Sequence, residues 1–87
     1  MKIEHQAVAG SLESSDVLIT ITPAASGLSV NVESVVMQQW GAHIKKTVED
    51  AMKAAGITDA VVDVKDRGAL ECTLQARIEA VLARAAK

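Results

Sequence analysis

Hydrophobic and polar residues alternate along two stretches in the first half of the chain, residues 16–22 and 28–34. Both stretches are rich in β-branched residues, so the pattern predicts two strands with one buried face each. The PAASG segment between them is typical of a short turn, and we expect the two strands to pair as a hairpin. The predicted inward residues are Val17, Ile19, Ile21, Leu28, Val30 and Val32.

The period then changes to three or four residues across 35–55 and again across 69–86, which predicts two amphipathic helices. Ser34 is expected to cap the first helix and Gly56 to end it. Between the helices, residues 57–65 alternate again and predict a third strand. The stripe of the second helix is Leu70, Leu74, Ile78, Val81, Leu82 and Ala85.

The predicted order is β-β-α-β-α after an N-terminal loop. We expect an α/β (α+β) fold: a two-layer sandwich in which a three-stranded mixed sheet has both helices on one face. Residues 1–15 lack sustained periodicity and contain a turn-prone cluster, so they are predicted to form a mobile loop. The chain of 87 residues is expected to be one domain, residues 1–87.

Composition restricts both the core and the function. Hydrophobic residues make up 49% of the chain, but Trp40 is the one aromatic residue, so the core must be aliphatic. Trp40 lies on the stripe of the first helix and is expected to be its buried anchor, with a surface partner contact as the alternative. A net charge of −2, without a basic stripe, disfavours nucleic-acid binding.

The chain also lacks the features of secreted and membrane proteins. Cys72 is the single cysteine and has no internal partner for a disulfide. No apolar run reaches the ~20 residues that span a bilayer, and the N-terminus lacks the apolar core of a signal peptide. We expect a soluble cytoplasmic protein that binds no membrane.

Standard catalytic and metal-binding signatures are missing from the sequence. His5 and His43 are expected to be structural or solvated, and Cys72 to be a small residue at a contact between helix and sheet. The spacing of the acidic residues Asp63, Asp66 and Glu71 forms no catalytic dyad, although Asp66 is expected to accept a hydrogen bond where the second helix begins.

Ser14 and Ser15 lie in the segment LESSD, between a glycine-bearing loop and the first predicted strand. A serine that accepts a bulky phosphate ester must be exposed and uncrowded, which loops provide. From these residues alone, an ordinary turn into the strand is the simpler interpretation.

Two longer motifs resemble the acyl carrier (gamma) subunit family of citrate lyase. AVAGSLESSDVLITITP, residues 7–23, is similar to a family signature of the approximate form A-V-A-G-T-L-E-S-G-D-V followed by an apolar strand. DRGALECTLQARIEAVLARA, residues 66–85, is similar to the family ending D-x-G-A-L-D-C-x-L-x-A-R-x-E-A-x-L-x-R-A. The two motifs keep the same order and spacing over nearly the whole chain.

The resemblance implies that Ser14 is the attachment serine, joined by a phosphodiester to 2′-(5″-phosphoribosyl)-3′-dephospho-CoA. It also implies a carrier subunit that is not catalytic by itself. Acetyl and citryl thioesters on this arm would pass between the alpha (transferase) and beta (lyase) subunits as citrate is cleaved to acetate and oxaloacetate. A prosthetic-group transferase would load the arm.

Two departures from the family pattern affect these expectations. Ser15 replaces the usual glycine and is a rival attachment site, and Ser11 replaces threonine. The chain ends at Lys87, so we expect the C-terminal tail of longer relatives to be absent. The alternatives are a malonate decarboxylase acyl carrier subunit, which uses the same arm, and a non-covalent adaptor that docks through the polar sheet face. Helical phosphopantetheine carriers fit less well, because their serine begins a helix.

Overall fold

The chain folds into one sheet and a layer of helices. The structure is a computed structural model that describes residues 3–86, without side-chain placement for residues 37 and 39. In chain order the elements are β1 (Ala7–Gly10), β2 (Val17–Pro23), β3 (Leu28–Ser34), a π-helical turn η1 (Met37–Gly41), α1 (Ala42–Ala54), β4 (Ala60–Asp66) and α2 (Glu71–Ala85).

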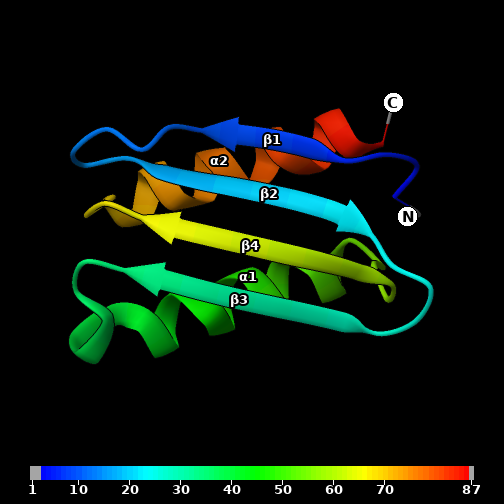
Figure 1. The fold of residues 1–87 in the computed structure, drawn as a ribbon, viewed down its shortest axis with the longest axis horizontal. Coiled ribbons are helices and arrows are strands. Elements are labelled where there is room, and N and C mark those ends of the chain that lie inside the picture. The colour runs from blue at the N-terminus through cyan, green and yellow to red at the C-terminus, as the bar shows by residue number, and fades with distance from the viewer. Residues whose placement is uncertain (1–2, 87) are drawn as a thin grey trace.

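The strands form one mixed sheet in the order β1-β2-β4-β3. β2 pairs antiparallel with both β1 and β4, whereas β3 and β4 run parallel. Both helices lie behind this sheet in Figure 1, with α2 behind β1 and β2, and α1 beside β3. The predicted α/β class, the mixed sheet and the two layers with both helices on one face are therefore confirmed.

The predicted hairpin between β2 and β3 is wrong, because β4 lies between these strands. β4 alternates residues that face outward with the fully buried Ala60, Val62 and Val64. In its central position β4 has a neighbouring strand along each edge. Neighbouring strands lie about 4.8 Å apart. The loop of residues 24–27 is long enough to cross the width of one intervening strand, since each residue reaches about 3.3 Å.

The sheet also has a fourth strand that the sequence did not predict. β1 falls inside the stretch 1–15 that was expected to be a loop, and residues 1–2 of that stretch lie outside the described residues. β1 pairs with β2 from Ala7 opposite Ile21 to Gly10 opposite Leu18. At the other edge of β1, the Arg84 guanidinium on α2 donates a 2.7 Å hydrogen bond to the Val8 carbonyl oxygen. The Arg84 side chain thus covers part of an otherwise unpaired strand edge.

The core lies between sheet and helices and is built from aliphatic side chains. Burying a side chain of this size contributes about 1.5–3 kcal/mol relative to leaving it exposed. The largest fully buried apolar side chains are Ile19, Ile21, Ile44, Met52, Ile78, Val17, Val48, Val62, Val64 and Val81. Trp40 packs against this core but is only partly buried, so the expectation of a buried anchor is wrong.

The two ends of the first helix differ in how well the sequence predicted them. Gly56 has φ +75° and follows the C-cap of α1, where its N–H and that of Ile57 donate to the last carbonyls of the helix. At the other end, helical structure starts at η1 after Val36, and no side chain caps it. The hydroxyl of Ser34 accepts from the Val36 N–H at 3.1 Å and donates to Asp66 at 2.7 Å instead.

Candidate attachment site

Three loops meet at one end of the sheet, at the left in Figure 1. They are residues 11–16 after β1, residues 35–36 after β3, and residues 67–70 after β4. Because β1, β3 and β4 all end on this side and β2 begins here, the strand directions bring these loops together. Ser14 and Ser15 lie in the first loop, and both are exposed.

Ser14 and Ser15 are the two corner residues of a tight turn. The Asp16 N–H donates to the Glu13 carbonyl at 3.1 Å, which closes the turn. Ser15 has φ +65° and is the one described non-glycine residue with positive φ. A turn with negative φ at its second residue and positive φ at its third is type II, which favours glycine at the third position. Glycine, which the signature resembled by residues 7–23 has at this position, would adopt this φ without strain.

The turn is fastened to the loop between β4 and α2. The Ser15 N–H donates to the Arg67 carbonyl at 2.8 Å, and the Arg67 N–H donates to the Asp16 carbonyl at 2.9 Å. The Ser14 hydroxyl, in contrast, takes part in none of the hydrogen bonds found among residues 3–86. Ser14 is therefore the exposed corner of a turn whose following residues are fixed.

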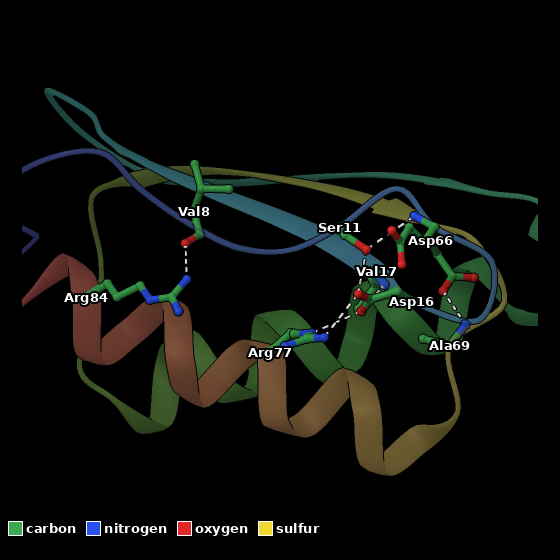
Figure 2. A network of polar contacts seen from close by, with 9 residues as sticks. Val8, Ser11, Asp16, Val17, Asp66, Ala69, Arg77 and Arg84 are labelled. Atoms are coloured by element: carbon green, nitrogen blue, oxygen red, sulfur yellow. Dashed lines mark hydrogen bonds and ion pairs between the residues drawn. The ribbon is translucent and has the colours of Figure 1, made fainter.

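Asp16 holds this loop to α2, as Figure 2 shows. The Arg77 guanidinium donates from Nε to Oδ1 and from Nη2 to Oδ2, both at 3.0 Å, across 61 positions of the chain. The Ser11 hydroxyl and the Val17 N–H each donate to the same carboxylate at 2.7 Å. Hydrogen bonds from Arg77, then from Ser11 and Val17, lower the pKa of Asp16 from 3.8 to about 2, and Asp16 in turn raises the pKa of Arg77. The pair is thus charged at neutral pH.

Gly10 fixes the start of the loop. A Cβ at this position would lie 1.7 Å from the Val17 carbonyl oxygen, and the residue has φ +95°. Only glycine allows β1 and the start of β2 to approach so closely. The glycine of the AVAG motif therefore has a steric role at the start of the loop that contains Ser14.

Asp66, at the end of β4, links the loop after β3 to the loop after β4. It is 1% exposed, and its carboxylate accepts from the Ser34 hydroxyl at 2.7 Å. The carboxylate also accepts from the Ala69 N–H at 3.0 Å, as Figure 2 shows. Its carbonyl accepts from the Val35 N–H at 3.3 Å. The sequence predicted Asp66 as an acceptor where the second helix begins. It accepts in the turn before α2, which starts only at Glu71.

Sequence reasoning missed the contact between His43 and Glu71, which belong to different helices. His43 Nε2 lies 2.9 Å from Glu71 Oε2, and the His43 ring stacks on Trp40 with centroids 4.3 Å apart. The hydrogen bond from His43 is the main cause that lowers the pKa of Glu71. His5 is exposed near the N-terminus, as expected.

The remaining candidates form no shared site. Cys72 is exposed, so the expected position at a contact between helix and sheet is wrong. Asp63 lies on the open sheet face, where it accepts from the Asn31 amide at 3.2 Å, away from the buried Asp66. Within residues 3–86 no group of three His, Cys, Asp or Glu side chains is placed to hold a metal ion. No helix in that part of the chain is long and apolar enough to cross a membrane.

Comparisons with known proteins identify the family of the chain. A family model described as "Malonate decarboxylase delta subunit (MdcD)" matches residues 4–85. The chain is 46% identical over 86 residues to the citrate lyase acyl carrier protein of Streptococcus uberis, covering 99% of this chain and 85% of that protein. It is 48% identical over 88 residues to citrate lyase acyl carrier protein 2 of Salmonella paratyphi A, covering 100% of this chain and 91% of that protein.

A solved structure also has this fold. A chain in the crystal structure of a Pseudomonas malonate decarboxylase hetero-tetramer in complex with malonate superposes with a TM-score of 0.75 at 21% identity, over 92% of this chain and 82% of that one. Fold, loop and relatives together define a small acyl carrier protein. The chain belongs to the acyl carrier family that the matching model describes, among the citrate lyase acyl carrier proteins.

Proposed function

We propose that this chain is the acyl carrier subunit of a citrate lyase, with a phosphoribosyl-dephospho-CoA arm attached to Ser14 through a phosphodiester. The observation that carries the proposal is the position of Ser14 at the exposed corner of an anchored turn. The relatives named citrate lyase acyl carrier proteins, at 44–48% identity, support the acyl carrier role.

The residues around Ser14 fit a covalent arm. Its hydroxyl has no hydrogen bond to lose among the described contacts, and solvent reaches it. The loop is fixed before it by the Ser11 hydroxyl, which accepts from the Glu13 N–H at 3.2 Å, and after it by the bond between Ser15 and Arg67. An arm on Ser14 therefore leaves from a defined point without disturbing the core.

Loading requires the transfer of the arm, through its phosphoryl group, to the Ser14 hydroxyl. The Ser14 Oγ forms the new bond to phosphorus of an activated phosphoribosyl-dephospho-CoA donor, and the donor's leaving phosphate departs with the bonding electrons. The serine proton passes to a base that the prosthetic-group transferase supplies. When attached, the arm supplies a terminal thiol for acyl thioesters.

The role of the chain's own residues is to hold and present this arm. Asp16 and Arg77 fix the loop to α2. The two-layer domain provides the surface on which the alpha (transferase) and beta (lyase) subunits dock. Tethering keeps the acyl group at a local concentration on the order of millimolar at both partner sites. The chain needs no catalytic acid or base for this task.

Intact mass spectrometry after co-production with the prosthetic-group transferase tests the attachment site. Wild type and Ser15→Ala are expected to gain the mass of the arm, and Ser14→Ala is expected to stay bare. Ser15→Ala is the matched control, because it removes a hydroxyl one residue away. Loading of Ser14→Ala but not of Ser15→Ala would move the site by one residue, and a bare wild type would contradict the carrier role.

Substrate identity requires a second measurement. The loaded chain is expected to restore citrate cleavage when mixed with citrate lyase alpha and beta subunits that lack their carrier. The same chain is expected to leave carrier-free malonate decarboxylase inactive. Restoration of malonate decarboxylation alone would assign the chain to the alternative complex.

A further inference from the structure

A hollow of about 440 Å³ opens at the same end of the molecule as Ser14. Its walls are mostly apolar, and the carboxylate at its rim is held by His43. The lining residues are Val36, Trp40, Gly68, Ala69, Leu70 and Glu71. None of the hydrogen bonds that fix the attachment loop passes through this hollow, so the attachment site described above does not account for it.

Exposed apolar side chains gather at the end of the sheet where the hollow opens, and two of them, Val36 and Leu70, line it. Five large hydrophobic residues of the described chain are exposed: Val8, Leu12, Val35, Val36 and Leu70. All except Val8 belong to the three loops at the Ser14 end, and Leu70 reaches 69% exposure. Single exposed apolar residues are ordinary, but a cluster beside a functional site marks a binding surface.

The hollow begins next to the attachment turn. Ser15 follows Ser14 and donates its N–H to the Arg67 carbonyl at 2.8 Å, and Gly68, the next residue, forms the lip of the hollow. With about 3.8 Å for each step along the chain, the lip lies within roughly 10 Å of Ser14. In the proposed arm, the phosphoribosyl group and the ADP part of dephospho-CoA lie between Ser14 and the pantetheine, so the arm is longer than this separation and must fold back to bring its far end to the hollow.

We propose that the hollow receives the uncharged pantetheine–acyl end of the arm while the arm is not engaged by a partner subunit. This inference rests on the proposed function for the identity of the arm. The exposed carboxylate of Glu71 and the apolar walls disfavour the phosphates and favour the uncharged end. A half-buried indole, Trp40, gives this end a flat apolar surface to lie against.

Size and tethering favour the arm over a partner protein as the occupant. A volume of about 440 Å³ is in the range of small-molecule sites. A protein interface uses roughly 20–30 residues on each side, far more than line the hollow. Because the arm is tethered at an effective concentration on the order of millimolar, a dissociation constant of about 1 mM already gives half occupancy.

The first test uses the bare chain and S-acetylpantetheine as the probe, with the fluorescence of Trp40 as the readout. We expect a saturable change with a dissociation constant of about 1 mM. Leu70→Asp, which places a charge in the hollow, is expected to weaken binding roughly fivefold or more. Leu12→Asp, an exposed loop residue outside the hollow, is the matched control and is expected to bind as wild type does.

Two outcomes of this titration would overturn the proposal. One is the absence of any saturable change in Trp40 fluorescence. The other is equal weakening by both aspartate variants, which would indicate general adsorption. Because this test needs no loading, its failure is separate from a failure of the carrier role, which intact mass spectrometry reports.

The second test compares loaded and bare chains in acrylamide quenching of Trp40. Loading is expected to reduce the quenching constant about twofold, since a half-occupied hollow shields the indole half of the time. Leu70→Asp is expected to remove most of this protection, since a site weakened about fivefold is occupied only about one-sixth of the time. Protection that appears only after the alpha or beta subunit is added would overturn the proposal and make the hollow a partner-docking surface.

Discussion

The layer between sheet and helices and the loop end of the sheet are held together by different forces. The layer consists of aliphatic side chains such as Ile19 and Val64 with almost no exposure. The loop end depends on polar contacts, led by the paired ions Asp16 and Arg77, and leaves apolar side chains exposed around Ser14. Substitutions in the layer should therefore give the largest losses of stability. Those at the loop end should change stability less, and among them Ser14→Ala should prevent loading and Leu70→Asp should weaken arm binding.

Ile19→Ala is expected to give the largest loss of stability. Ile19 is fully buried in β2, a strand paired on both sides. The substitution should lower the free energy of unfolding by about 2–5 kcal/mol, measured by urea denaturation. The fraction that remains folded should still be loaded at Ser14. A loss below about 1 kcal/mol would mean that the layer is far more adaptable than its packing indicates.

Trp40→Ala is expected to have a smaller effect, because Trp40 joins the layer to the loop end. A fully buried tryptophan replaced by alanine costs about 3–5 kcal/mol, and a partly buried one should cost about 1–2 kcal/mol. Urea denaturation measures the loss, with Trp40→Phe as the control that keeps an aromatic ring. A loss above 3 kcal/mol would place Trp40 with the buried layer instead.

Arg77→Met is expected to change how stability depends on pH. The folded-state pKa of Asp16, about 2, lies below its ordinary value of 3.8. Its stabilising contribution is therefore full above about pH 4 and is lost as the pH falls toward 2. In Arg77→Met the pKa of Asp16 should rise toward its ordinary value, so stability falls less steeply between pH 4 and 2.

Arg84→Met provides the control for this pH dependence. Arg84 lies on the same helix but donates to the Val8 carbonyl, a group that does not titrate. Its removal should lower stability equally at every pH, which leaves the profile parallel to that of wild type. Circular dichroism during acid unfolding measures these profiles. Profiles of the same shape for wild type and Arg77→Met would argue against the assigned role of Asp16.

The buried layer was largely predictable from the sequence, because its signal is local. Alternation assigned the inward residues of β2 and β4 correctly, and helical periodicity found Ile78 and Val81. β1 was missed since AVAG is short and its small residues have weak strand preference. Its alanines are buried and α2 packs against β1, a tertiary effect that local preference does not contain.

The loop end was much less predictable, because its contacts join distant positions. The family resemblance selected Ser14, but nothing local indicated that Asp16 pairs with Arg77 across 61 positions. Leu70 was assigned to a buried stripe, yet α2 begins one residue later and leaves it exposed. Strand order decides which loops meet, and the predicted pairing of β2 with β3 was wrong.

Ser15→Gly is expected to have the smallest effect, and it isolates the backbone of the attachment turn. Relief of positive φ at Ser15 gains about 1–2 kcal/mol. The added freedom of glycine in the unfolded chain offsets about 0.5–1 kcal/mol of that gain. Urea denaturation should therefore show a net stabilisation below about 1 kcal/mol, with Ser15→Ala slightly destabilised as the control. Loading at Ser14 should persist in both variants, because neither changes the corner hydroxyl. If Ser15→Gly were destabilised, the hydroxyl of Ser15 would have to stabilise the turn through a contact absent from the hydrogen bonds described.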